Sequence, residues 1–433
     1  MERIWTTELA EHSGEHVQLA GWMQHLRQLS SVTFLILRDG KGTAQIVLDE
    51  PAMIEQLRHL CHETVVTVEG DAVAEAQAPG GVEVRNVTID VVAPATMSPP
   101  FDLFRPVLKA QLPTLLDHAA LALRHPRRRA TFRIEAAAMS GFRAALGARD
   151  FIEIQTPKLV GSATESGANV FPVDYFGRRA YLAQSPQLYK QIMVGVFERV
   201  FEVGPVFRAE PHDTPRHLNE YVSLDAEMGF IHDHTTVMAT LTDVLRGIFA
   251  AIRDEAGLAL ALLELHVPEV PERIPAIHFA DAQELLARET GEQVVGEPDL
   301  APAHEAWLGT WARREYGSDF LFVTGYPMVK RPFYTHPDPD RPAFSNSFDL
   351  LFRGLELATG GQRLHRYEEY LDALGRNGID PEALSGYLEA FRHGLPPHGG
   401  FAIGLERLVA RLVGATNVRD TTLFPRDMHR LTP

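Results

Sequence analysis

Residues 201–210 read Phe-Glu-Val-Gly-Pro-Val-Phe-Arg-Ala-Glu, an apolar run that ends in an arginine and a glutamate. A polar loop follows through residues 216–220 (Arg-His-Leu-Asn-Glu), and a second strand-like run extends from 221 to 227. An unpaired guanidinium beside buried apolar sequence is costly, so Arg208 needs an anionic partner. The stretch therefore predicts two strands joined by a polar loop whose charged side chains take part in chemistry.

Two other segments place charged residues in apolar, strand-like sequence. Residues 151–159 (Phe-Ile-Glu-Ile-Gln-Thr-Pro-Lys-Leu) predict a strand that ends at its proline. Residues 399–408 (Gly-Gly-Phe-Ala-Ile-Gly-Leu-Glu-Arg-Leu) bring Arg407 next to an apolar run, where it too needs an anion. Short strands and long helices, such as one over 130–147, alternate around these segments, so we expect one large α+β domain over residues 130–433.

The first 95 residues have a different pattern. Runs rich in Val, Ile, Thr and aromatic residues are separated by glycine-containing turns, and they lie at 17–22, 32–38, 43–47, 64–69 and 82–91. Five short strands in this space fit a small closed barrel of the oligonucleotide-binding type. Residues 96–129 contain several prolines and end in a basic run, and we expect them to be a linker.

Composition limits the class of protein. The 433 residues are 45% hydrophobic and 23% charged, with a net charge of −16, which is typical of a globular protein and excludes disorder or collagen-like repeats. A lone Cys61 excludes an intramolecular disulfide and indicates a reducing compartment. The polar N-terminus and the lack of about 18 consecutive apolar residues lead us to expect a cytoplasmic protein without a membrane partner. The histidines are scattered, so no histidine metal site is expected.

In order and spacing, the three charged segments resemble the three signature motifs of the class II aminoacyl-tRNA synthetases. A barrel ahead of such a domain is similar to the subgroup for aspartate, asparagine and lysine. The resemblance covers nearly the whole chain. It implies an α+β fold in which a five-stranded OB-fold barrel over residues 1–95 binds the anticodon, and a catalytic domain carries an antiparallel sheet flanked by helices.

The resemblance implies a site where ATP activates an amino acid. Two anions must meet there, so arginines and Mg²⁺ are needed to offset their charge. Arg208 and Arg407 would be the catalytic residues, with Arg208 on the α-phosphate and Arg407 on the γ-phosphate. Glu210 would accept the adenine amino group, and Tyr221 would stack on the adenine. The whole ATP site would comprise Arg208, Glu210, Arg216, His217, Tyr221, Glu356 and Arg407.

The Mg²⁺ ligands implied by the resemblance lie in the apolar run 348–356 and just after it. Asp349 and Glu356 would lie side by side on two adjacent strands, with Thr359 close to them. Oxygen ligands of this kind suit Mg²⁺. The alternative is structural: Asp349 caps a turn, and Glu356 pairs with Arg353.

Residues 184–191 (Gln-Ser-Pro-Gln-Leu-Tyr-Lys-Gln) resemble the substrate segment of the aspartyl subgroup. Lys190 and Arg363 would bind the substrate's side-chain carboxylate, and two cations disfavour a neutral asparagine. A serine follows Glu165 where the family has a glycine. The aspartate site would comprise Glu165, Gln187, Lys190, Arg208, Asp225 and Arg363. The alternatives are a solvated Lys190 and an ion pair between Arg363 and Glu356.

In the barrel, the resemblance assigns anticodon contacts to Arg27, Phe34 and Gln45, although Phe34 could instead belong to the core. The loop around Pro79 has no side chain that donates a hydrogen bond, whereas strict relatives tend to have a lysine there. The chain also lacks room for the large extra domain of many bacterial aspartyl enzymes. We therefore expect a compact archaeal-type enzyme that charges tRNA-Asp and also tRNA-Asn, which implies an amidotransferase partner.

Three alternatives remain. The chain could be an asparagine enzyme, a strictly discriminating aspartate enzyme, or a relative that has lost catalysis. The first motif lies at the dimer interface in the family, so we also expect a homodimer.

Overall fold

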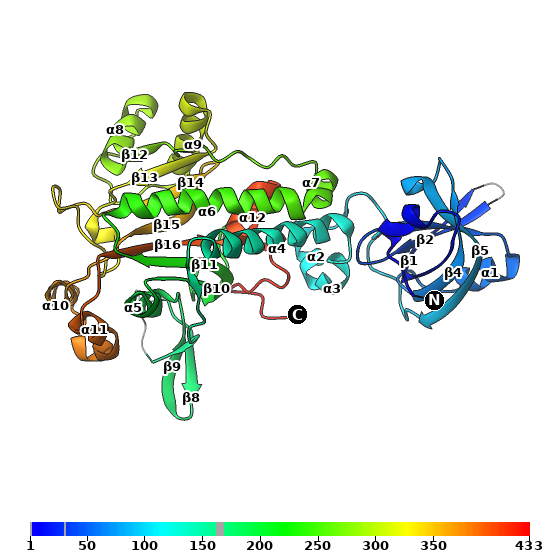
Figure 1. Cartoon of the computed structure of the whole chain (residues 1–433), viewed down its shortest axis with the longest axis horizontal. Coiled ribbons are helices and arrows are strands. Elements are labelled where there is room, and N and C mark those ends of the chain that lie inside the picture. Colours follow the sequence, from blue (N-terminus) through cyan, green and yellow to red (C-terminus); the bar gives the residue numbers. More distant parts are fainter. Residues whose placement is uncertain (1, 30–31, 162–168) are drawn as a thin grey trace. The chain divides into compact units, whose positions relative to one another are not determined.

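The computed structural model describes residues 2–29, 32–161 and 169–433 of the chain. It divides into two compact units, residues 1–129 and 130–433 (Figure 1). Each unit has its own hydrophobic core.

The N-terminal unit is the predicted five-stranded barrel. Its strands close in the order β1-β2-β3-β5-β4, and they are β1 (His16–Leu29), β2 (Val32–Arg38), β3 (Thr43–Leu48), β4 (Val65–Ala74) and β5 (Val82–Ala93). Alternate residues such as Leu19 and Leu35 fill the barrel, as the period of two requires. The turn between β2 and β3 is fixed by Asp39, whose carboxylate accepts hydrogen bonds from the backbone N–H groups of Lys41 and Gly42. The short helix α1 (Pro51–Arg58) was not predicted.

The segment predicted as a linker is partly helical. It contains α2 (Leu112–Asp117) and α3 (Ala119–Ala122), and α4 (Pro126–Gly147) begins inside its basic run. Pro126 opens α4 because a proline at the first helical position loses no hydrogen bond. The predicted helix over 130–147 therefore starts four residues early and ends where expected.

An eight-stranded sheet forms the centre of the C-terminal unit, in the order β12-β13-β14-β15-β16-β11-β10-β6. The strands are β6 (Ile152–Glu153), β10 (Arg199–Phe207), β11 (Glu220–Gly229), β12 (Ala276–His278), β13 (Phe320–Thr324), β14 (Ser347–Phe352), β15 (Leu355–Gln362) and β16 (His398–Gly404). The pairs in the middle are antiparallel, as predicted, but the pair at each edge is parallel. The strand predicted over 151–159 is reduced to β6, and the chain then leaves this sheet. It enters a three-stranded sheet of β7 (Leu159–Val160), β8 (Pro172–Tyr175) and β9 (Arg178–Leu182).

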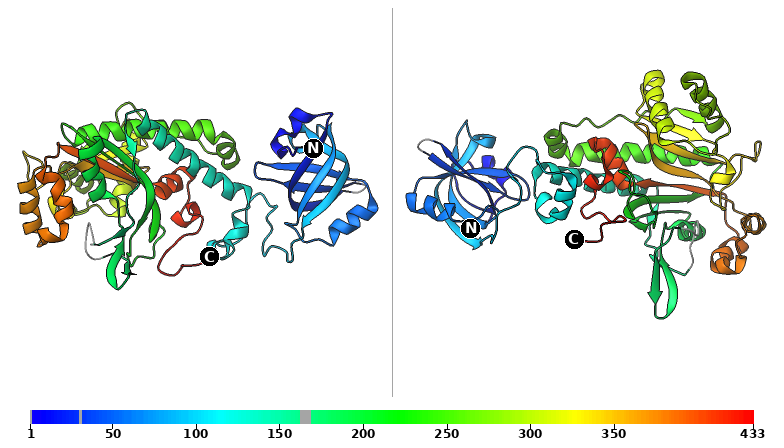
Figure 2. Two further views of the ribbon diagram at one scale, coloured as in Figure 1. Left: turned by 60° about the horizontal axis from the view of Figure 1, so that its bottom comes forward. Right: turned by 180° about the vertical axis from the view of Figure 1, so that it is seen from behind.

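One face of the large sheet is covered by α4 and α6 (His234–Glu255), which lie side by side in Figures 1 and 2. They approach closely where Gly141 faces Gly247, since a Cβ on Gly141 would lie 2.8 Å from the Gly247 carbonyl oxygen. By length and composition α6 could cross a membrane, contrary to our expectation for any stretch of the chain. Here its apolar face packs on the sheet as a core helix.

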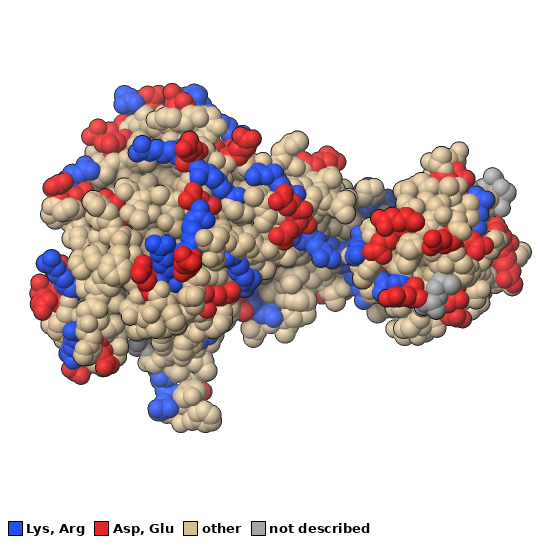
Figure 3. Space-filling model, in the orientation of Figure 1, with Lys and Arg blue, Asp and Glu red and all other residues tan. Residues whose placement is uncertain are grey.

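The remaining helices surround the sheet: α5 (Gln187–Phe197), α7 (Gly257–Leu263), α8 (Phe279–Thr290), α9 (Pro302–Tyr316), α10 (Tyr367–Arg376), α11 (Ser385–Arg392) and α12 (Leu405–Val413). Acidic and basic side chains are interspersed on the face of the molecule drawn in Figure 3. Along β11, Leu224, Ala226 and Met228 point into the core. Residues 221, 223, 225 and 227 therefore lie on the opposite face, where the candidate site is found.

Candidate active site

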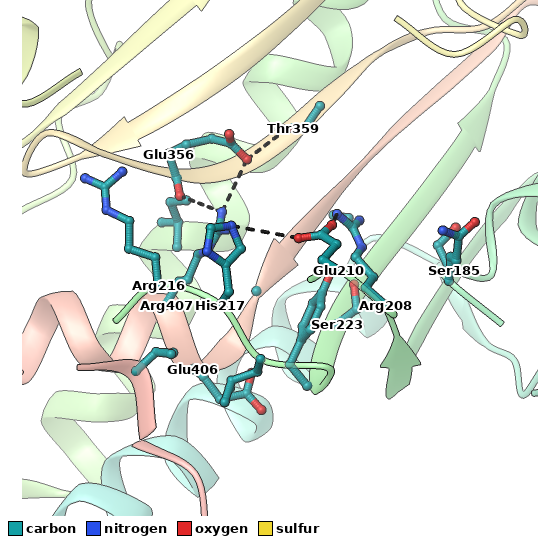
Figure 4. A pocket seen from close by; sticks show the side chains of 17 residues that line it. Ser185, Arg208, Glu210, Arg216, His217, Ser223, Glu356, Thr359, Glu406 and Arg407 are labelled. Carbon is teal, nitrogen blue, oxygen red and sulfur yellow. Dashed lines mark hydrogen bonds and ion pairs between the residues drawn. The ribbon is translucent and has the colours of Figure 1, made fainter. Parts of the chain in front are cut away.

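A cavity lies on this open face, lined by the loop between β10 and β11, by β15, and by the junction of β16 with α12. Every residue predicted for the ATP site lines it: Arg208, Glu210, Arg216, His217, Tyr221, Glu356 and Arg407. Figure 4 shows the side chains that it labels, among them Arg208, Glu210 and Arg407, converging from separate elements. Two of the three charged segments of the sequence, 201–227 and 399–408, thus meet at the cavity, whereas no residue of 151–159 lines it.

The loop between β10 and β11 is held at its base by Asn219, which sequence reasoning missed. The Arg208 N–H donates to the Asn219 carbonyl at 2.9 Å, and the Asn219 side-chain amide donates to the Arg208 carbonyl at 2.6 Å. These bonds extend the strand pairing beyond Glu220. They bring the Arg208 guanidinium to 5.7 Å from the centre of the Tyr221 ring.

The cations of the cavity have carboxylate partners at long distances. Arg208 Nη1 lies 3.8 Å from Glu210 Oε1, and Arg407 Nη1 lies 3.4 Å from Glu356 Oε1. Pairs that are long and partly exposed are weak. Phosphate oxygens can therefore replace these carboxylates as partners of the arginines.

Two further groups have shifted pKa values: His217, which lines the cavity, and Glu305, which contacts Arg216 beside it. Arg216 Nη1 lies 3.7 Å from Glu305 Oε2 on α9, a residue that sequence reasoning missed. Burial and, next, the Glu356 charge raise the pKa of Glu305 to about 7. Burial lowers the pKa of His217, against the opposing effect of Glu210, so this imidazole is neutral at physiological pH.

The predicted Mg²⁺ ligands lie together on β14 and β15. Asp349 is directly opposite Thr359, and the Thr359 hydroxyl donates to Glu356 Oε1 at 3.4 Å. Burial raises the pKa of Asp349 to about 6, while Arg331, bound to its carboxylate at 3.0 Å, opposes this rise and Glu356 adds to it. Two carboxylates and a hydroxyl, with carboxylate charges that repel each other, fit a hard cation such as Mg²⁺.

The structural alternative for Glu356 is wrong, because Arg353 Nε donates to Asp319 at 3.1 Å. Arg331 was also missed. It lies 24 residues before the start of β15 (Leu355) in an irregular segment, and no sequence pattern links it to Asp349.

Further along β11 from Ser223, which lines the cavity, lies a buried cluster centred on Glu227, and none of its residues lines the cavity itself. Lys190 Nζ donates to Asp225 Oδ1 at 2.9 Å and lies 3.4 Å from Glu227 Oε2. Arg363 Nε donates to Glu227 Oε1 at 2.9 Å, and the Gln187 amide donates to Glu227 Oε2 at 3.3 Å. Asp225 Oδ2 is buried, and none of the described residues is hydrogen-bonded to it. The structure thus brings Gln187, Lys190, Asp225 and Arg363 together.

Both alternatives for the two cations are wrong. Lys190 is 1% exposed and not solvated, and Arg363 pairs with Glu227 and not with Glu356. Burial opposes ionisation of Glu227, but Arg363 and then Lys190 keep its pKa below the usual value. The sequence did indicate a position in the site for Glu227. Apolar and polar residues alternate over 222–227, so residue 227 lies on the same face of the strand as Asp225.

Small residues on β16 make room for this cluster. Gly400 lies opposite Glu227, and a Cβ on Gly400 would collide with the Glu227 carboxylate and the Ala226 carbonyl. Glu165, the remaining residue that the resemblance places in the aspartate site, lies outside the described residues.

In the barrel, the register pairs Arg27 with Phe34, and Ile36 with Gln45. Phe34 is half-buried and does not belong to the core cluster, so the alternative of a core role is wrong. Arg27 is exposed, whereas Gln45 is buried and donates to Glu83 Oε2 at 2.8 Å.

The loop around Pro79, expected to relax the choice between the two tRNAs, joins β4 to β5. Pro79 is exposed and opens a short turn over Pro79–Gly81. Gly80 and Gly81 have φ of 77° and 76°, a conformation that favours glycine.

Comparison with known proteins identifies the family. Residues 111–428 match the model of tRNA synthetases class II (D, K and N), and residues 17–92 match the OB-fold nucleic acid binding domain. Proteins named Aspartate–tRNA(Asp/Asn) ligase from Thermus thermophilus and Deinococcus radiodurans are 47% and 45% identical to the chain, and each alignment covers at least 99% of both chains. An Aspartate–tRNA(Asp) ligase from Thermoplasma acidophilum is 39% identical over 100% of both.

Among solved structures, asparaginyl-tRNA synthetase from Pyrococcus horikoshii complexed with asparaginyl-adenylate matches with a TM-score of 0.91 and 30% identity, over 100% of both chains. The sequence motifs, the barrel and the catalytic fold all agree with the matched families. The chain therefore belongs to the class II tRNA synthetases of the aspartate, lysine and asparagine group, with an N-terminal OB-fold anticodon-binding domain.

Proposed function

We propose that the protein joins L-aspartate to the 3′ end of tRNA-Asp, and also of tRNA-Asn, using ATP with Mg²⁺ as cofactor. The observation that carries the choice of amino acid is the buried cluster of Lys190, Glu227 and Arg363 beside Asp225. Lysine and arginine side chains only donate hydrogen bonds. A substrate carboxylate only accepts them, whereas an amide must also direct its own N–H donors at some group. The donors therefore favour aspartate.

Glu227 changes the reason for this preference. The sequence argument counted two cations that a neutral substrate would leave unpaired, but Glu227 already pairs with both of them. Selection then depends on the pattern of donors and not on net charge. Glu227 is also an acceptor that an asparagine amide could reach, and this is the specific observation in favour of an asparagine enzyme.

Activation of aspartate needs positioning and charge stabilisation more than proton transfer. The attacking carboxylate is ionised at neutral pH, so no general base is required. Arg208 would hold this carboxylate and the α-phosphate, and Arg407 would hold the γ-phosphate. Glu210 and Tyr221 would bind the adenine from its edge and its face. Mg²⁺ held by Asp349, Glu356 and Thr359 would offset the charge of the β- and γ-phosphates.

The substrate's ammonium group would occupy the space beside Asp225. The Oδ2 atom of Asp225 is buried, and no described residue donates a hydrogen bond to it. Leaving this oxygen unpaired is costly unless a ligand supplies the donor. An α-ammonium group is such a donor. Its attachment there would direct the α-carboxylate towards Arg208 and the side chain towards Lys190 and Arg363.

The barrel supports the choice of tRNA. Phe34 offers a half-exposed aromatic face on which a base can stack, with Arg27 beside it in the register. The side-chain nitrogen of Gln45 donates a hydrogen bond to Glu83. The side-chain oxygen of Gln45 would then contact the central base of the anticodon. Pro79 presents no hydrogen-bond donor to the third base of the anticodon. The lack of a donor at this position supports acceptance of both tRNAs. Aspartyl-tRNA-Asn would then need an amidotransferase partner.

We also propose a homodimer formed through α4 and β6, in the cytoplasm. β6 is a two-residue strand at the edge of the large sheet, and its Ile152 is 45% exposed. An uncovered edge strand invites pairing with another chain. Analytical ultracentrifugation of the purified protein should give twice the chain mass of 48.1 kDa. The mass of a single chain would contradict the dimer.

The experiment that tests the proposed activity is amino-acid-dependent exchange of pyrophosphate into ATP, with aspartate, asparagine and lysine compared at equal concentration. We expect exchange with aspartate and at least about 100-fold less with asparagine, the discrimination typical of a site that hydrogen-bonds one of two such substrates. Equal or greater exchange with asparagine would instead establish the alternative that Glu227 raises.

A further inference from the structure

Two imidazoles and a carboxylate meet on the loop between β10 and β11. Glu210, His212 and His217 each offer one ligand atom, and these atoms all lie within 4.8 Å of one another. The His212 and His217 rings are stacked with their centres 5.2 Å apart, and His217 Nε2 lies 3.8 Å from Glu210 Oε2. The scattered histidines of the sequence gave no sign of this group.

The ligand types select a class of metal. Two imidazole nitrogens and one carboxylate oxygen suit Zn²⁺ and Co²⁺, whereas Mg²⁺ prefers oxygen ligands alone. In a tetrahedral site with bonds of about 2.0–2.1 Å, neighbouring ligand atoms are about 3.4 Å apart. The His217 Nε2–Glu210 Oε2 distance of 3.8 Å is slightly longer than this value and the other ligand atoms lie within 4.8 Å, so side-chain rotations must bring the three groups together to close the site.

Thr214 already orients His217 for such a role. Its hydroxyl lies 2.6 Å from His217 Nδ1, and it accepts a hydrogen bond from the backbone N–H of Arg216 at 3.2 Å. The contact at Nδ1 leaves Nε2 directed at Glu210, as the dashed line in Figure 4 shows. Metal-binding histidines are commonly oriented by a hydrogen bond at their other nitrogen.

Nearby cations oppose a divalent ion at this place. Arg208 lies 3.8 Å from Glu210, and the charges of Arg216 and Arg407 also act on His217. The affinity should therefore be that of a reversible, exchangeable site and not that of a structural zinc site.

We propose that Glu210, His212 and His217 form a binding site for one Zn²⁺-type transition-metal ion, and that the bound ion excludes adenine from the ATP site. The exclusion rests on the role proposed above for Glu210, because a carboxylate bound to metal cannot also accept the adenine amino group. The binding of the metal rests on the loop geometry alone.

The test uses the full-length protein and Co²⁺, which absorbs visible light intensely when its coordination is tetrahedral. The wild-type protein should bind one Co²⁺ with such a spectrum, and Zn²⁺ should displace it. In His212→Asn the affinity should fall by at least about tenfold, as expected when a metal site loses one protein ligand. His232→Asn is the matched control, since His232 is exposed and lies outside the cluster.

His212 has no role in the proposed ATP site, so His212→Asn should keep the aspartate-dependent exchange activity and lose its inhibition by free Zn²⁺. Unchanged Co²⁺ binding in His212→Asn, or no binding in wild type, would overturn the metal site. The exclusion is tested separately with an aspartyl-adenylate analogue whose phosphate is replaced by a sulfamoyl group, because ATP itself chelates metals. The analogue should displace Co²⁺, and simultaneous binding of both would overturn the exclusion while leaving the metal site in place.

Discussion

At the scale of single residues, Glu227 organises the amino-acid site. It is fully buried, and it contacts Lys190, Arg363 and Gln187, which come from distant parts of the chain. A buried carboxylate is tolerated only when it is paired and hydrogen-bonded. The same contacts fix the three side chains that would surround the substrate, so the stability of the cluster and the selection of the substrate depend on one group.

Substituting Lys190→Met removes the donor that joins Asp225 to Glu227. We expect the aspartate KM to rise by about 100-fold and the ATP KM to change by less than about threefold, since truncating one partner of a buried charge pair costs 2–5 kcal/mol. Steady-state kinetics of pyrophosphate exchange measures both constants.

The matched control is Lys158→Met, which breaks another ion pair with a buried glutamate, Glu202, outside the cavity. It should lower stability without a selective effect on aspartate. If Lys190→Met raised both KM values equally, Lys190 would be a structural residue only.

The sequence predicted residues that belong to contiguous motifs, and it missed those whose role depends on contacts between distant segments. Lys190, Asp225 and Arg363 were predicted and lie together in the structure. Glu305 and Arg331 could not be found, because each approaches the cavity from a segment with no recognisable pattern.

At the scale of elements, β16 needs glycine at position 400 because β11 presents the Glu227 carboxylate directly opposite. Gly400→Ala should lower the free energy of unfolding by about 1–3 kcal/mol, the usual cost of overpacking, and should abolish aspartate-dependent exchange. Gly375→Ala in α10 is the control, since a Cβ there meets nothing and should be neutral or stabilising. Denaturant unfolding measures both variants. A Gly400→Ala protein with wild-type stability would contradict this account of β16.

Helix α4 carries a carboxyl group that makes stability depend on pH. Burial and, next, the charge of Glu406 raise the pKa of Glu135 to about 8. The folded protein therefore binds this proton more tightly than the unfolded chain does, and the contribution of Glu135 to stability falls as the pH rises from about 4.5 to about 8.

Glu135→Gln removes this dependence. Relative to wild type, the variant should be more stable at about pH 9 than at about pH 5. The full shift corresponds to about 5 kcal/mol, and partial exposure of the side chain should reduce the difference to about 2 kcal/mol. Chemical unfolding at the two pH values measures it. An equal effect of the substitution at both would show that Glu135 is already ionised at neutral pH in the folded protein.

The type and order of elements could be predicted where the hydrophobic pattern is strong, as in the five barrel strands and the long helix. The parallel pairs at the edges of the large sheet could not, because β6 and β12 have two and three residues and too short a pattern to give a direction.

At the scale of the whole molecule, anticodon recognition and amino-acid activation reside in separate units, and so substitutions should affect them separately. Phe34→Ala should reduce kcat/KM for aminoacylation by about 10- to 100-fold, the effect of losing one base stack worth 1–3 kcal/mol. Pyrophosphate exchange should be unchanged. A parallel loss of both activities would mean that Phe34 supports the fold and does not contact the tRNA.

The central claim is that this protein attaches aspartate to two tRNAs. The most direct test is aspartylation of purified tRNA-Asp and tRNA-Asn transcripts in parallel, with ATP and Mg²⁺, and with Pro79→Lys beside the wild type. We expect comparable kcat/KM on both tRNAs for the wild type, and a selective loss on tRNA-Asn for Pro79→Lys. Charging of tRNA-Asp alone by the wild type would contradict relaxed recognition, and charging of either tRNA with asparagine in place of aspartate would contradict the claim as a whole.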